Sequence, residues 1–158
     1  MIIWLASYPK SGNTWLRFVL SNYFYNIAQN ETDLTILDKI DKFPPHKFLK
    51  KIVNENNLKK NPYDICKYWL EVQKQIINET SDPFVFLKNH NALVKIDNYE
   101  LTNQIFSLAA IYIVRDPRDV VLSYANHNSK SQKESAEDLI KGRSLGEDNQ
   151  DQVNVYPG

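Results

Sequence analysis

The sequence predicts an α/β fold in which helices cover both faces of a central parallel sheet. Three short, almost wholly apolar runs, at residues 2–6, 83–88 and 109–114, have the length and composition of strands buried on both faces. Helical periodicity follows the first and third runs, and a further helical pattern precedes the second. Strands that alternate with helices favour parallel pairing, because a crossover helix returns the chain to the same end of the sheet.

The length and charge of the chain are those of one ordinary globular domain. It has 158 residues, 42% hydrophobic and 24% charged, which favours a single core. Nineteen basic residues balance nineteen acidic ones, so we expect neither nucleic acid nor a membrane as a partner, and any anion site must be local. A single cysteine, Cys66, excludes an intramolecular disulfide and a multi-cysteine metal site, and it fits a cytoplasmic protein. The apolar run at 2–6 is too short to span a bilayer and has no cationic leader, so we expect no secretion.

The first unit of the chain is predicted to be a strand, a tight loop and a helix. The apolar run Ile2–Ala6 stops at a segment that contains Pro9 and Gly12, and a new period begins at Asn13. From there the apolar residues recur at helical spacing: Trp15, Leu16, Val19, Leu20, Tyr23, Phe24 and Ile27.

The middle of the chain is predicted to contain helices and a second strand. Breakers at Pro44, Pro45 and Pro62 interrupt a polar region, in which we expect short helices over about 34–41 and 46–56. A stronger amphipathic pattern follows. It runs from Tyr63 to Glu79, with Ile65, Tyr68, Trp69, Val72, Ile76 and Ile77 on one stripe. The second strand, Pro83–Lys88, comes next and ends at Asn89-His90-Asn91.

The last part is predicted to hold a third buried strand between two helices. We expect a helix near 98–106, then the strand Ala109–Val114, and then a helix from Pro117 to about Asn128. Proline favours the first turn of a helix, where its missing N–H costs nothing. A further short helix over about 136–141 precedes a polar tail.

Polar side chains follow each of the three predicted strands at its carboxyl end. Lys10 follows the first strand, His90 the second and Arg115 the third. In open parallel sheets, ligands bind beyond the carboxyl ends of the strands. We therefore expect these three residues to converge on one crevice.

The loop between the first strand and the first helix has the layout of a P-loop, so the prediction is a P-loop-type three-layer αβα fold. Backbone N–H groups at a helix N-terminus point at one spot and favour an anion there, and Gly12 allows close approach. The loop departs from the ATP-binding pattern G-x-x-x-x-G-K-S/T, because Ser7 replaces the first glycine and Asn13 the lysine. The lysine has moved to Lys10, which is a poor fit to a magnesium–ATP enzyme, and we expect no metal.

Residues 8–15, Tyr-Pro-Lys-Ser-Gly-Asn-Thr-Trp, resemble the 5′-phosphosulfate loop of the cytosolic-type sulfotransferases, Y-P-K-S-G-T/N-T-W. The resemblance implies that the donor is 3′-phosphoadenosine 5′-phosphosulfate (PAPS). Lys10 would bind the oxygen that bridges phosphate and sulfate, and Trp15 would stack on adenine. The 5′-phosphate would be held by Ser11, Gly12, Asn13 and Thr14.

Residues 113–124 resemble the second signature of that family, R-N/D-P-K/R-D-x-x-x-S. Arg115 leaves the strand end and Ser123 lies about two turns into the next helix, so both could reach one phosphate. The resemblance implies that they bind the 3′-phosphate, which distinguishes PAPS from ADP. The other charged residues of this segment are predicted to be structural. We interpret Asp116 as a helix cap and Arg118 and Asp119 as surface charges.

The segment Lys88-Asn89-His90 resembles the K-x-H element of the same family. In that family the histidine removes the proton of the acceptor hydroxyl, and imidazole is suited to this task because its ordinary pKa is near neutrality. We therefore expect His90 to be the catalytic base and Lys88 to supply a second cation.

The resemblance covers about residues 1–128, and the late R-K-G element of the family is missing. We therefore expect residues 1–158 to form a single, partial domain, truncated at its C-terminus, whose uncovered apolar surface favours a homodimer.

Three hypotheses for the function remain open. The chain is a sulfotransferase, a PAPS-binding module without turnover, or a P-loop kinase for a small molecule. The acceptor, a small molecule or a glycan, cannot be read from the sequence. The aromatic residues that would line an apolar acceptor pocket, with the core as the better default, are Phe43, Phe48, Tyr63 and Trp69.

Overall fold

The computed structural model describes residues 1–26, 34–54 and 62–140, without the side chains of residues 62 and 63. In chain order the elements are β1 (Ile2–Ser7), α1 (Asn13–Tyr25), the 3-10 helix η1 (Leu34–Lys39), α2 (His46–Ile52), the 3-10 helix η2 (Pro62–Tyr68), α4 (Trp69–Glu79), β2 (Val85–Asn89), β3 (Lys95–Ile96), β4 (Tyr99–Glu100), β5 (Ser107–Ile113), α5 (Pro117–Asn128) and α6 (Gln132–Ile140). No helix within these ranges is long and apolar enough to cross a bilayer.

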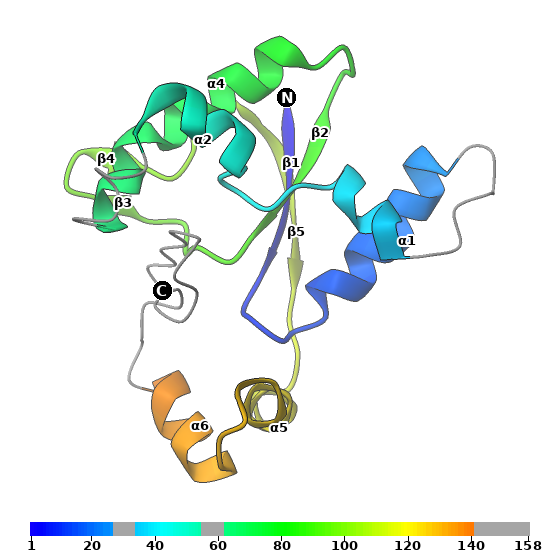
Figure 1. Ribbon diagram of the computed structural model, residues 1–158, viewed down its shortest axis with the longest axis vertical. Coiled ribbons are helices and arrows are strands. Elements are labelled where there is room, and N and C mark those ends of the chain that lie inside the picture. The colour runs from blue at the N-terminus through cyan, green and yellow to red at the C-terminus, as the bar shows by residue number, and fades with distance from the viewer. Residues whose placement is uncertain (27–33, 55–61, 141–158) are drawn as a thin grey trace.

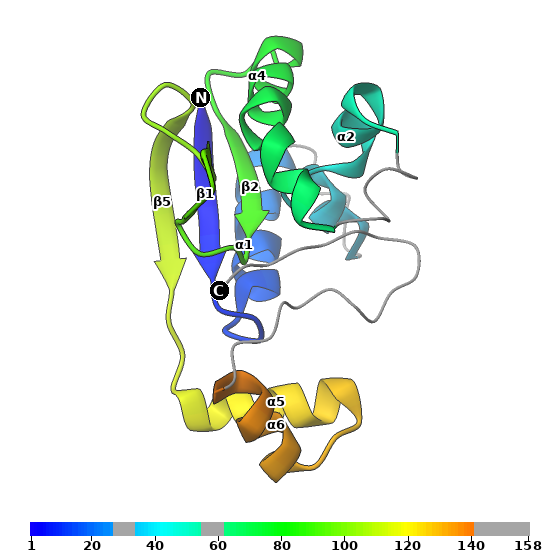
Figure 2. The ribbon, with the colours of Figure 1, turned by 90° about the vertical axis from the view of Figure 1, so that its left-hand side faces the viewer.

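The three predicted strands form one parallel sheet in the order β2-β1-β5. Figure 1 shows this sheet between α1 on one side and α2 and α4 on the other, with α5 and α6 beyond the ends of the strands. Figure 2 shows the three strands side by side and pointing the same way. The predicted P-loop-type αβα architecture is therefore confirmed.

Alternate residues of β1 supply a separate core on each face of the sheet. Ile2 and Trp4 belong to the cluster that α4 covers. The Trp4 ring meets Phe43 edge-on at 5.0 Å, and its Nε1 donates to Ser107 Oγ at 2.7 Å. This bond ties β1 to β5 across the sheet. The predicted stripe of residues 63–79 is confirmed, because Ile65, Trp69, Val72 and Ile76 are buried in this cluster and Tyr68 and Ile77 pack against it.

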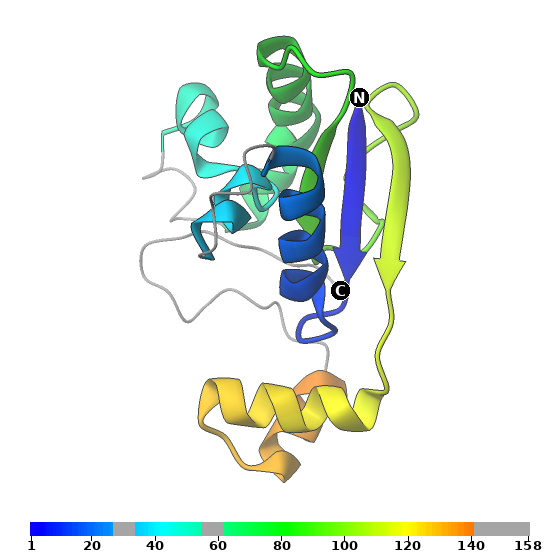
Figure 3. The same ribbon diagram turned by 90° about the vertical axis from the view of Figure 1, so that its right-hand side faces the viewer.

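On the opposite face, Leu5 and Phe86 pack against Leu16 and Leu20 of α1. Phe24, one turn further along α1, lies 5.2 Å from the Phe86 ring. Residues four apart on a helix share a face, so this row is the one that α1 presents to the sheet. Figure 3 shows α1 packed along the sheet on this side.

The apolar residues of α1 nevertheless do not form one buried stripe, which corrects the sequence prediction. Trp15 and Tyr23 are 71% and 80% exposed, and Val19 is exposed as well. The buried row of the helix is polar and consists of Asn13, Arg17 and Ser21. Ile27 lies outside the described residues.

For Asn13 and Arg17 the physical reason is that backbone carbonyls accept their hydrogen bonds. Asn13 Nδ2 donates to the Leu5 carbonyl at 2.8 Å. Arg17 Nη2 donates to the carbonyls of Leu37 and Ile40, each at 2.6 Å. Hydrogen bonding makes burial of polar groups tolerable, so periodicity alone could not separate the two faces.

The third strand is also less buried than predicted. β5 lies at an edge of the sheet and pairs, among the described residues, only with β1. Tyr112 is 68% exposed and Leu108 and Ile111 are exposed too. The helix α5 leads away from β5 instead of packing back on it (Figure 2), so an apolar composition here does not mean burial.

The predicted helix near 98–106 is wrong. This segment contains a two-strand hairpin, in which Lys95 pairs with Glu100 and Ile96 with Tyr99. Its turn is Asp97-Asn98, and Asp97 has a φ of 53°. Asp and Asn tolerate this left-handed conformation better than most residues, so the dipeptide was a turn signal that the sequence analysis missed.

The remaining predicted elements agree with the structure in place, with differences in helix type. The segments expected to be helical at 34–41 and at the start of 63–79 are largely 3-10 helices. The helix from Pro117 to Asn128 is confirmed, with Asp116 accepting from the Arg118 N–H at 2.9 Å as its cap. The helix expected at 136–141 begins earlier, at Gln132. Residues 55–56 and 141, at the ends of two predicted helices, lie outside the described residues.

The buried polar row of α1 leads to a prediction about stability. Ser21→Leu places a large side chain where Ser21 is fully buried, so it should lower the free energy of unfolding by about 1–3 kcal/mol. Tyr23→Ser removes an exposed ring and should change it by less than about 0.5 kcal/mol. Urea denaturation of the two variants measures the difference. A larger loss from Tyr23→Ser than from Ser21→Leu would show that Tyr23, and not Ser21, lies on the buried face of α1.

Candidate active site

The loop between β1 and α1 is shaped to hold an anion. Gly12, at the start of α1, has a φ of 105°, a conformation that side chains rarely adopt. Lys10 also has a positive φ, 65°. No atom of the described chain lies within 4 Å of where a Cβ on Gly12 would be. The first turn of α1 has no acidic residue, so its N–H groups and the helix dipole favour a negative ligand here.

The side chain of Asn13 fixes the loop to the end of β1. It is buried, and its Nδ2 donates to the Leu5 carbonyl at 2.8 Å and to Ser7 Oγ at 3.1 Å. The side chain therefore ties the start of α1 to the end of β1. The binding role that the sequence analysis assigned to Asn13 therefore stays a prediction for its backbone N–H alone, because the side chain is used inside the fold.

The predicted base lies directly beside this loop. His90 follows β2, and its Nδ1 lies 2.7 Å from the Ser7 carbonyl and 3.2 Å from Ser7 Oγ. A carbonyl only accepts hydrogen bonds, so Nδ1 carries the proton. This tautomer makes Nε2 the basic nitrogen of the ring.

The surroundings keep the His90 ring neutral. Burial and, after it, the positive charge of Lys88 lower its pKa to about 4, against the opposing hydrogen bond to Ser7. The backbone next to His90 is fixed by its neighbours, because the Asn91 N–H donates to Asn89 Oδ1 at 3.0 Å. A neutral, oriented imidazole is the form that a general base requires.

Lys88 stands at the end of β2 on the face that α1 covers. It pairs in register with Leu5 of β1. Burial lowers the pKa of Lys88 to about 8, and the charges of Lys42, Arg17 and Lys10 add to this effect in that order. Several cations thus lie close together in a chain with no net charge, as a local anion site requires.

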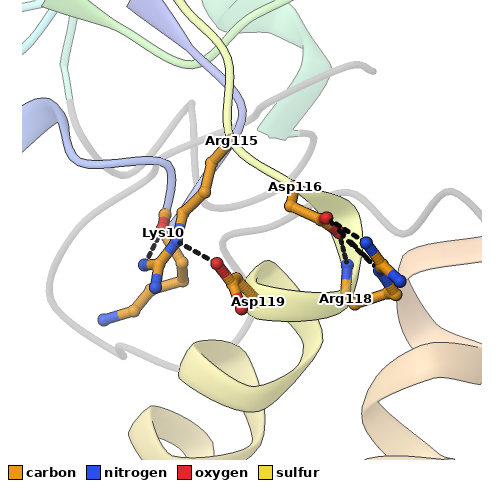
Figure 4. A network of polar contacts seen from close by, with 5 residues as sticks. All are labelled: Lys10, Arg115, Asp116, Arg118 and Asp119. Atoms are coloured by element: carbon orange, nitrogen blue, oxygen red, sulfur yellow. Dashed lines mark hydrogen bonds and ion pairs between the residues drawn. The ribbon is translucent and has the colours of Figure 1, made fainter.

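Arg115 connects the third strand end to the loop. Its Nη1 donates to the Lys10 carbonyl at 3.2 Å, and its Nε lies 3.8 Å from Asp119 Oδ2 (Figure 4). The three strand ends therefore meet as predicted, because His90 contacts Ser7 at the end of β1 and Arg115 contacts Lys10 in the loop that follows. The shared crevice stays a prediction. Asp116 and Arg118 form a separate pair with an Nη2–Oδ2 distance of 2.6 Å.

Ser123 lies four residues after Asp119 on α5. Residues at this spacing share a helix face, so Ser123 lies on the face that meets Arg115. The role of Arg115 and Ser123 in binding a phosphate stays a prediction.

The aromatic candidates divide into two groups. Trp15 is 71% exposed at the first turn of α1, where a flat ligand could cover it. Phe43, Phe48 and Trp69 are buried core residues, as the default expectation had it. The side chain of Tyr63 lies outside the described part.

Sequence analysis missed the roles of three residues that shape this site: Ser7, Arg17 and Lys42. None of them carries a local signal of its role, since each acts through a partner far away in the chain. In the described ranges, no three His, Cys, Asp or Glu residues are grouped to hold a metal ion.

The fold and the site together define a P-loop-type α/β protein. Its anion site is lined by positively charged side chains, and a neutral histidine lies beside it. The family model described as the sulfotransferase domain matches residues 2–154. The chain belongs to the sulfotransferase family. This membership supports sulfotransferase activity in general terms. A comparison with curated proteins finds no match to this chain.

The environment of His90 leads to a spectroscopic prediction. Nitrogen-15 NMR should show the ring as the Nδ1–H tautomer, with a pKa of about 4. Lys88→Met should raise that pKa, because it removes the nearest positive charge. A titration midpoint at the ordinary value of about 6.5 in the unchanged protein would contradict the burial of His90 and the effect of Lys88, and an Nε2–H tautomer would contradict the contact with the Ser7 carbonyl.

Proposed function

We propose that this chain transfers the sulfuryl group of PAPS to a hydroxyl or amine acceptor. The observation that carries the proposal is the meeting of three strand ends at one edge of the sheet. The Ser7–His90 contact joins the loop to the base, and the Lys10–Arg115 contact joins it to the arginine of the second signature. PAPS supplies the activated sulfuryl group, and the chain supplies the groups that bind it and accept the proton.

The residues present fit an anionic donor. The ammonium groups of Lys10 and Lys88 make no hydrogen bond or ion pair in the described part of the chain. Among the described residues, Arg115 makes one hydrogen bond, at 3.2 Å, and one ion pair, at 3.8 Å, so a phosphate offers it a better partner. In this proposal Arg115 and Ser123 bind the 3′-phosphate, the loop N–H groups bind the 5′-phosphate, and Trp15 covers the adenine.

The transfer step requires a base on one side of the sulfur and cations on the other. His90 accepts the acceptor's proton at Nε2 as the acceptor oxygen or nitrogen bonds to sulfur. The bond from sulfur to the bridging oxygen breaks, and its electron pair stays on the 5′-phosphate. Lys10 and Lys88 stabilise the charge that gathers on that oxygen, which is the main contribution of such groups.

Two other functions are less well supported. A kinase loop needs a lysine at the position of Asn13, but the Asn13 side chain points under the loop to Leu5 and Ser7. A binding module without turnover would not need a base, whereas His90 is held in one tautomer and kept neutral. Sulfuryl transfer accounts for both the loop without the kinase lysine and the neutral, oriented His90.

Nucleotide titration is the direct test of the donor. Isothermal calorimetry should show 3′-phosphoadenosine 5′-phosphate (PAP) binding at least about tenfold more tightly than ADP, because charge-assisted hydrogen bonds to the 3′-phosphate favour PAP by about 1.5–3 kcal/mol. Lys10→Ala should weaken PAP binding by a similar factor. Equal affinity for PAP and ADP in a folded sample would refute the proposed donor.

His90→Ala separates binding from chemistry in the same assay. The variant should bind PAP as tightly as the unchanged protein and lose sulfuryl transfer by about 10²–10⁴-fold. Loss of PAP affinity instead would make His90 a binding residue.

The two lowered pKa values predict the pH dependence of kcat/KM. The ratio should rise as His90 loses its proton, with a pKa of about 4, and fall as Lys88 loses its proton, with a pKa of about 8. In Lys88→Arg the alkaline fall should disappear, because a guanidinium stays protonated throughout. An alkaline limb that is unchanged in this variant would assign it to another group.

A further inference from the structure

The segment just before Phe43 extends the sheet at the outer edge of β2. The Phe43 N–H donates to the Lys88 carbonyl at 2.8 Å, and the Lys88 N–H donates to the Asp41 carbonyl at 2.9 Å. Lys42 and Lys88 thus form an isolated parallel bridge. Paired residues in adjacent strands project to the same face, so Lys42 stands beside Lys88 on the face that α1 covers.

Arg17 fixes this segment to the helix that begins at the anion loop. Its Nη2 group binds the carbonyls of Leu37 and Ile40, each at 2.6 Å. Arg17 is only 8% exposed. The position of Lys42 is therefore set by backbone hydrogen bonds from β2 and by a buried arginine, and not by its own side chain.

The side chain of Lys42 is exposed, and the described residues offer it no acidic partner. It makes no hydrogen bond or ion pair in the ranges that the structure describes. Its neighbour Asp41 is occupied, with Oδ2 2.7 Å from Lys47 Nζ. Lysines elsewhere on the surface, such as Lys51 beside Glu79, do have acidic partners.

Lys42 lies on the far side of Lys88 from the anion loop. Its segment pairs with the outer edge of β2, whereas the loop that carries Lys10 follows β1, on the other side of β2. Lys88 thus lies between the loop and Lys42, and the charge of Lys42 acts on both Lys88 and His90. In the proposed function, Lys10, Lys88 and the loop N–H groups bind the anionic donor. The charge of Lys42 is then available to bind a second ligand.

We propose that Lys42 is a specificity-determining residue that selects acceptors bearing a fixed negative charge, such as a carboxylate, phosphate or sulfate, near the hydroxyl or amine that is sulfated. The inference rests on the proposed function, because it takes the space beside His90 as the acceptor side. An exposed lysine pairs with such an anion at modest gain and fixes its orientation.

The test compares acids with their uncharged amides. The probes are 4-hydroxyphenylacetate, glycolate and glucuronate, each against its amide, titrated into protein saturated with PAP. At least one acid should bind about fivefold more tightly than its amide, and added salt should reduce the preference. Lys42→Gln should abolish the preference and leave binding of the amide unchanged.

A matched control is available in the same segment. Lys39→Gln removes an exposed lysine that does not act on His90 or Lys88, so the preference for the acid should persist. Equal binding of acid and amide for all three probes would overturn the inference, as would a preference that survives Lys42→Gln.

The experiment distinguishes failure of the Lys42 proposal from failure of the proposed function. The same acid and amide titrations are repeated without PAP, and the binding of PAP is measured first. Failure of PAP to bind counts against the proposed donor, whereas the acid preference and its loss in Lys42→Gln decide the role of Lys42.

Discussion

The site depends on one buried amide. Asn13 joins the carbonyl of Leu5 to Ser7 Oγ, and Ser7 in turn holds His90 through its own carbonyl. The end of β1, the anion loop and the base therefore form one hydrogen-bonded unit with little freedom to rearrange. Because β1 is the central strand, with neighbours on both sides, this unit is placed in the most constrained part of the sheet.

The second constraint is the density of positive charge. Bringing Lys10, Arg17, Lys42 and Lys88 together is unfavourable without an anion, and the lowered pKa of Lys88 expresses that repulsion together with burial. The fold offsets it with packing and backbone hydrogen bonds elsewhere. A ligand with several negative charges relieves the repulsion when it binds, so the free protein is less stable than its packing alone would make it.

Sequence patterns predicted the three strands, their parallel pairing and the meeting of their ends, because apolar runs and helix caps leave local signals. They predicted the stripe of α4 for the same reason. They could not separate the faces of α1, since the polar row of Asn13 and Arg17 is buried only because carbonyls far away in the chain receive it. The pairing of Lys42 with Lys88 likewise joins two segments that are far apart in the chain. Neither segment contains a local pattern that predicts it.

Within the described residues the outer edge of β5 is unpaired, which has a consequence for handling the molecule. Seven successive residues, Ser107–Ile113, carry no charge and no proline, which are two of the devices with which edge strands resist pairing with other chains. Concentrated samples should therefore lose material to strand-mediated association sooner than dilute ones. Raising the salt will give little protection, since there is no charge along this edge to screen.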